Sequence, residues 1–122
     1  MILCVAKSEE LLLSLDALLR ASGRKPFLCL EFADAARVLA YQPVELVIAD
    51  DTLDSKAGCA IIQKAHNCKP RIPVIFWTAR DATSQPLNEF DPDVILSRAS
   101  GTEELLRIVA RLEGKPPGKE HL

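Results

Sequence analysis

The chain has 122 residues, of which 48% are hydrophobic and 26% are charged, and its net charge is −2. This length supports one domain with a substantial hydrophobic core and leaves no room for a second. The 15 basic residues are scattered among 17 acidic ones, which argues against direct contact with nucleic acid. No stretch approaches the roughly 20 apolar residues of a membrane helix, and the N-terminus lacks the features of a signal peptide. We therefore expect a cytoplasmic protein without a membrane partner.

The four cysteines lie mostly within apolar runs and are not spaced as CxxC pairs. In a reducing compartment, such cysteines act as small core residues more often than as disulfides or zinc ligands. We therefore predict core packing, without a disulfide or zinc framework, for Cys4, Cys29, Cys59 and Cys68.

The first half of the chain alternates between short apolar runs and helical spacing. Residues 2–6 form an apolar run that predicts a strand. A helix is expected to open at Ser8 and to stop at Gly23, because leucines recur between them at intervals of three and four residues. Residues 26–30 predict a second strand, and residues 34–42 predict a short helix.

The second half continues this alternation and contains one irregular stretch. Residues 44–49 are almost continuously apolar, as in a strand covered on both faces. Pro86 and Pro92 leave space for at most one or two helical turns between residues 80 and 92. The other expected elements are a helix over 58–68, a strand over 72–79, a strand over 94–97 and a helix over 102–113.

Five apolar strands that alternate with helices predict an α/β fold with a parallel sheet and helices on both faces. In such sheets, ligands collect at the carboxyl ends of the strands. Six residues of interest fall at these ends: Ala6, Lys7, Asp50, Asp51, Thr78 and Arg98.

The order of these elements, together with residues at the strand ends, carries a resemblance to a known family. Asp50 follows an apolar strand, Gly58 comes eight residues later, Thr78 ends the fourth strand and Arg98 follows the fifth. Over residues 1–114, the chain resembles the receiver domain of two-component response regulators. The resemblance implies a flavodoxin-like (βα)5 fold with a doubly wound parallel five-stranded sheet in the order 2-1-3-4-5. The irregular stretch then corresponds to a shortened or irregular fourth helix.

The resemblance also implies a role for each of these residues. Asp50 takes the phospho-acceptor position, while Thr78 and Arg98 take the switch and phosphate-contact positions, where the family has a hydroxyl residue and a lysine. Phosphorylation of an aspartate requires Mg²⁺ to hold the carboxylate against the phosphoryl oxygens. The family usually supplies further metal ligands from two acids at the end of the first strand, which here are Ala6 and Lys7.

Three further positions depart from the family pattern. Asp54 and Ala99 stand where the family has prolines, and Ile95 stands where it has the aromatic switch residue. The relay that links the Thr78 hydroxyl to that aromatic residue is therefore incomplete.

We interpret the chain as a degenerate receiver, or pseudo-receiver. We expect it to act as a regulatory protein-interaction module rather than an enzyme, with neither a catalytic residue nor a metal cofactor. Lys7 and Arg98 are expected to flank Asp50, to replace Mg²⁺ by a salt bridge and to lower the pKa of its carboxyl. The expected partners are signalling proteins, namely a histidine kinase or an output domain, and a second copy of the chain. Residues 115–122 are expected to form a disordered tail or the root of a linker.

Three alternatives stay open. The first is an active phospho-acceptor that uses Asp50 and Thr78 with an atypical Mg²⁺ site. Asp51, Glu9 and Glu10 are the possible acidic ligands, but we expect Asp51 to be solvated or capping and the two glutamates to favour the helix dipole. The second is that Asp50 and its neighbours are loop acids at a polar rim. The third is a small α/β enzyme or nucleotide binder, which requires a glycine-rich loop that the segment after the first strand lacks.

Overall fold

The computed structural model describes residues 1–50, 52–53, 55–79 and 92–113, and these form a parallel five-stranded sheet. The strand order is β2-β1-β3-β4-β5, so the predicted flavodoxin-like architecture is confirmed. The strands are β1 (Ile2–Val5), β2 (Pro26–Cys29), β3 (Leu46–Asp50), β4 (Val74–Thr78) and β5 (Val94–Ser97).

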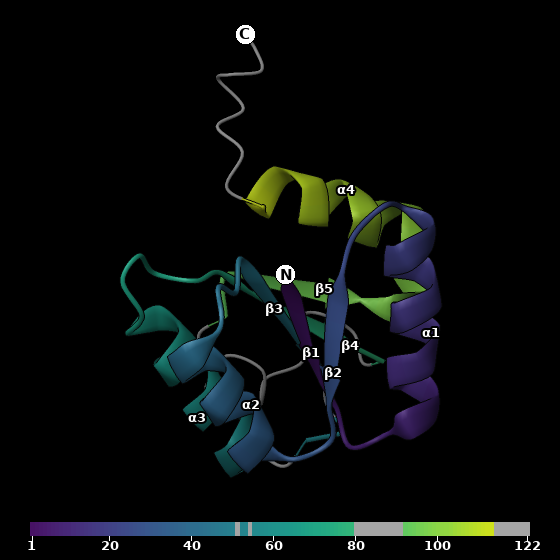
Figure 1. Cartoon of the computed structure of the whole chain (residues 1–122). Coiled ribbons are helices and arrows are strands. Elements are labelled where there is room, and N and C mark those ends of the chain that lie inside the picture. Colours follow the sequence, from purple (N-terminus) through teal and green to yellow (C-terminus); the bar gives the residue numbers. More distant parts are fainter. Residues whose placement is uncertain (51, 54, 80–91, 114–122) are drawn as a thin grey trace, which may run out of the picture.

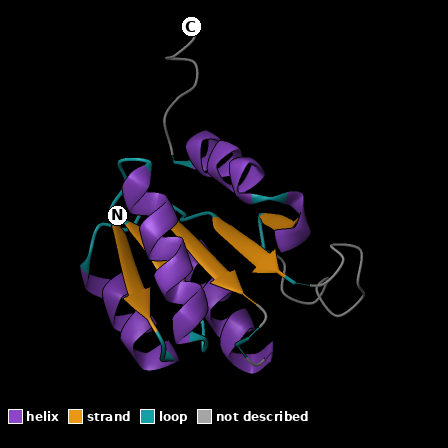
Figure 2. Ribbon diagram, turned by 90° about the vertical axis from the view of Figure 1, so that its right-hand side faces the viewer, coloured by secondary structure: helices purple, strands orange, loops and turns teal. Residues whose placement is uncertain are grey.

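Helices cover both faces of this sheet. Figure 1 looks onto its β2 edge, with α1 (Glu9–Ala21) on one side and α2 (Phe32–Tyr41) and α3 (Ser55–His66) on the other. The last helix, α4 (Thr102–Leu112), packs on the same face as α1, and Figure 2 shows the strands lying between the helices. Within the described ranges, none of the helices is long and apolar enough to span a membrane.

The core consists of two apolar clusters, one on each face of the sheet. Residues of β1, β3 and β4 contribute alternately to the two clusters, as the pleat of a strand requires. Every residue of these three strands is buried, which explains why their sequences are nearly continuous apolar runs. The cluster under α2 and α3 includes Val47, Ile61 and Phe76, and the cluster under α1 and α4 includes Ile48, Leu15 and Leu105.

Local signals set the ends of α1. The Ser8 hydroxyl accepts a hydrogen bond from the Leu11 N–H, which satisfies one of the free donors of the first turn. Gly23 follows the helix at φ +84°, a conformation that is strained for residues with a side chain. The predicted limits of this helix are therefore confirmed.

Two predicted helix starts were wrong by a few residues. Helix α2 begins at Phe32 rather than at residue 34, and α3 begins at Ser55 rather than at Gly58. Lys56 and Ala57 are compatible with a helix, so the acidic loop is shorter than predicted and Gly58 lies buried inside α3. The irregular stretch at 80–91 and the tail at 115–122 lie outside the described residues.

None of the four cysteines, all of which the structure describes, forms a disulfide. Cys4 and Cys29 are buried, and the other two pack at the edge of the core. Burial raises the pKa of the Cys4 thiol to about 12 and that of Cys29 to about 11. These two thiols therefore stay protonated at neutral pH and act as apolar packing groups.

An ion pair fastens the start of β2 to the end of α4. Arg24 Nε lies 2.8 Å from Glu113 Oε2 and Arg24 Nη2 lies 3.1 Å from Glu113 Oε1, a two-pronged contact between residues 89 positions apart. Both side chains are largely buried. We expect Arg24→Ala to lower the free energy of unfolding by about 1–2 kcal/mol, because it removes charge-assisted hydrogen bonds from a partly buried carboxylate.

Chemical denaturation of four proteins measures this coupling: wild type, Arg24→Ala, Glu113→Ala and the double variant. The exposed pair Arg37–Asp34, within α2, provides a matched control, since its loss is expected to cost well under about 1 kcal/mol. Equal effects of the two pairs would show that Arg24 does not tie α4 to the rest of the domain.

Candidate functional site

The predicted site residues lie at one edge of the sheet, at the carboxyl ends of β1, β3, β4 and β5. Val5 pairs with Ala49, so Ala6 lies next to Asp50 at the end of β3. Asp50 pairs in turn with Trp77, and Thr78 pairs with Ser97, which directly precedes Arg98. Asp50 is therefore flanked by β1 on one side and by β4 on the other.

Asp50 is a buried carboxylate with charged and neutral donors around it. Only 1% of the residue is exposed. Its Oδ1 accepts a hydrogen bond of 2.7 Å from the Thr52 hydroxyl, and its Oδ2 lies 3.4 Å from Arg98 Nη1. This burial is incompatible with the alternative in which Asp50 is a loop acid at a polar rim. A buried carboxylate needs such partners, since an unpaired charge in the interior is strongly unfavourable.

Arg98 is held over Asp50 by two further contacts. The same Nη1 donates a hydrogen bond of 3.1 Å to the Trp77 carbonyl, and the guanidinium carbon lies 5.6 Å from the centre of the Trp77 ring. An arginine stacks on an aromatic ring in this way through its flat, weakly hydrated guanidinium. Trp77 of β4 thus positions the Arg98 charge beside the Asp50 carboxylate.

Lys7 does not take the role that the sequence predicted. Its ammonium lies 3.4 Å from Glu31 Oε1, in a pair whose two side chains are more than half exposed, instead of pairing with Asp50. The reason is the alternation of side chains along an extended chain, which buries Ala6 and directs Lys7 to the surface. The contribution of Lys7 to the site is its backbone N–H, which donates to the Thr52 hydroxyl at 2.8 Å.

Thr52 is a residue of the candidate site that the sequence argument missed. Its hydroxyl accepts from the Lys7 N–H and donates to Asp50, so it links the end of β1 to the end of β3. A threonine two positions after a buried aspartate is a weak signal for such a local hydrogen bond. This link occupies one oxygen of the carboxylate with a neutral donor.

The other predicted site residues are less tightly defined. Thr78 is completely buried at the end of β4, and Ile95 is partly buried on β5. Glu9 and Glu10 are exposed in the first turn of α1, where they favour the helix dipole, as expected. Asp51 and Asp54 lie outside the described residues.

The described residues do not fit a Mg²⁺ site of the kind that receiver domains use. Magnesium prefers several oxygen ligands, mainly carboxylates and water. Here the position before Lys7 is a buried alanine, and a guanidinium lies 3.4 Å from the Asp50 carboxylate. Across the part of the chain that the structure describes, no group of three or more His, Cys, Asp or Glu side chains is placed to hold a metal ion.

A second polar cluster lies at the opposite, amino ends of β4 and β5. Asp93 Oδ1 lies 2.7 Å from Arg71 Nη1, and Asp93 Oδ2 lies 2.8 Å from His66 Nε2 and accepts from the Val74 N–H at 2.7 Å. His66 is the last residue of α3, and its side chain is only 15% exposed and lies against Asp93. This cluster joins the end of α3 to the start of two strands and is distant from Asp50 along the sheet.

Comparison with known proteins identifies the fold. Neither a family model nor a curated protein sequence matches the chain. Solved structures do match, and three represent them. The receiver domain of a sensor histidine kinase from Pseudomonas aeruginosa PAO1, with a magnesium ion in its active-site cleft, is 22% identical, with a TM-score of 0.79 over 93% of this chain and 97% of that one. The signal receiver domain of an HD domain-containing protein from Pseudomonas fluorescens Pf-5 is 25% identical, with a TM-score of 0.77 over 91% of each chain. The response regulator TrrA from Thermotoga maritima, in complex with Mg²⁺ and BeF, is 20% identical, with a TM-score of 0.78 over 91% of this chain and 96% of that one.

These matches cover nearly the whole of both chains in each case. At such low sequence identity, the likeness is one of fold, and function depends on the residues at the site. The fold expected from the sequence is therefore confirmed, and the roles of Asp50, Thr78 and Arg98 have to be argued from their surroundings.

Proposed function

We propose that this chain, which has the fold of response regulator receiver domains, is a signalling module that acts through protein contacts and without Mg²⁺-dependent phosphorylation of Asp50. One observation carries this proposal. The Asp50 carboxylate is buried and lies against the Arg98 guanidinium and the Thr52 hydroxyl, which supply charge and hydrogen bonds from within the chain. The negative charge that a metal would neutralise is thus already compensated.

The positions beside Asp50 support the same conclusion. Phosphorylation adds roughly two negative charges, and a divalent metal is what usually makes this tolerable in a small pocket. The Ala6 side chain has no ligand atom, and the Lys7 ammonium lies against Glu31 at the surface. In our proposal, Arg98 replaces the metal permanently, and the domain is held in one state that does not depend on a phosphate.

The biological role that follows is regulation by binding. The proposed partners are signalling proteins of the cytoplasm, either a histidine kinase or an output domain. An active phospho-acceptor is the second candidate, and the burial of both Asp50 and Thr78 at adjacent strand ends favours it. It requires that Arg98 move off the carboxylate to admit both a phosphoryl group and a metal.

Treatment with acetyl phosphate and Mg²⁺ separates the two candidates. We expect no aspartyl phosphate on the wild-type chain, measured by intact-protein mass spectrometry under mild conditions and by phosphate-affinity electrophoresis. An active receiver domain treated in parallel verifies the reagent, and Asp50→Asn is the matched control for labelling elsewhere. Mg²⁺-dependent labelling of the wild type that disappears in Asp50→Asn would establish the active phospho-acceptor instead.

A further inference from the structure

Most of the large exposed apolar side chains of the described residues lie around one edge of the sheet. Phe27 is 44% exposed on β2, Leu30 is 39% exposed just after it, and Tyr41 is 79% exposed at the end of α2. A groove of about 540 Å³ lies between this edge strand and α2, lined in part by Phe27, Val38 and Tyr41. Exposed aromatic side chains grouped beside a groove are typical of a protein interface.

Among the described strands, β2 pairs with β1 alone, and β1 does not use all of the hydrogen-bonding groups of the β2 backbone. The carbonyls of Lys25 and Cys29 accept from the N–H groups of β1, so the odd-numbered residues of β2 turn their polar groups toward β1. In a ladder, the residues between them face the other way. The backbone groups of Pro26, Leu28 and Leu30 therefore point away from β1. Pro26 is a buried residue and offers only a carbonyl, because it has no N–H.

Antiparallel pairing of two β2 strands centred on Leu28 matches these groups to each other. In that register, the Leu28 N–H donates to the Leu28 carbonyl of the second copy, and the Leu30 N–H donates to the Pro26 carbonyl of the second copy. The missing N–H of Pro26 then falls at the outer end of the ladder, where water reaches the opposite carbonyl. A shift of two residues in either direction loses part of this ladder.

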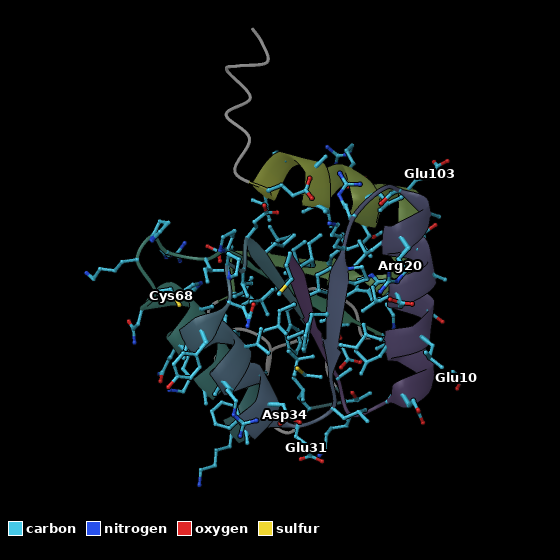
Figure 3. All side chains as sticks on the ribbon, viewed as in Figure 1. Glu10, Arg20, Glu31, Asp34, Cys68 and Glu103 are labelled. Atoms are coloured by element: carbon cyan, nitrogen blue, oxygen red, sulfur yellow. The ribbon has the colours of Figure 1, made fainter. Side chains whose placement is uncertain are left out.

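The charges that flank β2 fit the same register. Lys25 precedes the strand, Glu31 follows it, and both are exposed. With Leu28 on the two-fold axis, Lys25 of each chain lies opposite Glu31 of the other, because each is three residues from the centre. Opposite charges across a strand pair are favourable and like charges are not. In Figure 3, Glu31 is seen at the carboxyl end of β2, close to Asp34 at the start of α2.

We propose that β2 is the dimerisation edge of this protein, and that a second copy of the chain pairs with it antiparallel through Leu28, with Phe27 and Tyr41 buried beside the junction. The occupant is a second copy because the charges and backbone groups of this edge complement themselves under two-fold symmetry. A closed two-fold contact of this kind also removes an open sheet edge that would otherwise promote aggregation. This inference does not depend on the phosphorylation state of Asp50.

Analytical ultracentrifugation of the full chain, from micromolar to near-millimolar concentration, tests the proposal. We expect a monomer–dimer equilibrium. Both Phe27→Ser and Lys25→Glu are expected to raise the dimer dissociation constant about tenfold or more, since the first removes buried apolar area and the second places like charges opposite each other twice. The charge swap Lys25→Glu with Glu31→Lys is expected to restore dimerisation when Lys7, which lies 3.4 Å from Glu31, is replaced by alanine in all the compared variants. Leu13→Ser is the matched control, because Leu13 is 57% exposed on α1, away from this edge.

A disulfide experiment tests the register independently of stability. The variant that combines Lys25→Cys and Glu31→Cys is expected to form a covalent dimer on oxidation, joined between positions 25 and 31 of different chains, which peptide mass spectrometry identifies. Either single cysteine variant is expected to stay unlinked at these positions. A chain that is monomeric at every concentration, or a dimer that Phe27→Ser and Lys25→Glu leave unchanged, would overturn the proposal.

Discussion

Replacing Arg98 by alanine is expected to lower the free energy of unfolding by about 3 kcal/mol, because it removes the guanidinium that lies 3.4 Å from the buried Asp50 carboxylate. The Asp50 side chain is 1% exposed, so water cannot readily take over from the guanidinium. The substitution also removes the hydrogen bond to the Trp77 carbonyl and the contact with the Trp77 ring. Urea denaturation monitored by circular dichroism measures the loss.

Two companion variants identify the cause of that loss. The double variant Asp50→Asn with Arg98→Ala removes the charge together with its partner, and we expect it to recover a large part of the stability that Arg98→Ala loses. Arg98→Lys keeps the charge but not the flat guanidinium, and an intermediate stability is expected. If the double variant loses as much stability, relative to wild type, as the two single variants lose together, Arg98 and Asp50 do not act as a pair.

Replacing Asp93 by alanine is expected to cost about 2 kcal/mol, because the Val74 N–H at the start of β4 loses its acceptor and His66 and Arg71 lose their common partner. The Asp93 backbone N–H donates to the Val74 carbonyl at 3.0 Å, so this residue closes the junction between β4 and β5 from both sides. Asp93→Asn, which retains an acceptor oxygen, is the matched control and is expected to be affected less.

The charge of Asp93 also predicts a pH dependence. Partial burial by itself raises the pKa of this carboxyl, but hydrogen bonds from the Val74 N–H, His66 and Arg71 outweigh that effect and hold the pKa below its ordinary value of 3.8. A folded-state pKa below the unfolded one gives stability that is complete above the ordinary value and is lost as the pH falls through the folded one. The difference in stability between wild type and Asp93→Asn is therefore expected to shrink as the pH falls below 3.8. A difference that grows on acidification would contradict the account.

The fold could be predicted because its strands are buried on both faces, which leaves short apolar runs in the sequence. The apolar run of β3 ends in the buried carboxylate of Asp50, and the order of the strands places β4 and then β5 beside β3, so that Asp50 and Arg98 meet at one edge. The apolar pattern and the strand order together are sufficient to predict that Asp50 and Arg98 are neighbours.

The rest depends on features that the pattern of apolar residues does not contain. Whether Lys7 turns toward Asp50 or toward Glu31 is decided by the position of a single residue along the extended end of β1. Thr52 and Asp93 act through hydrogen bonds with backbone groups of distant segments, and their partners become neighbours only once the sheet has formed. Polar contacts between segments that are distant in the sequence cannot be predicted from the pattern of apolar residues.

The most direct test of the central claim is a set of amide NMR spectra of the folded protein, recorded alone, with Mg²⁺, and with Mg²⁺ and beryllofluoride, which mimics an aspartyl phosphate. A closed pocket neutralised by Arg98 predicts that the resonances of Asp50, Thr78 and β5 stay unchanged in all three spectra, while an active receiver domain responds under the same conditions. Saturable shifts at these residues that require both Mg²⁺ and beryllofluoride would contradict the account and establish a working phosphorylation site.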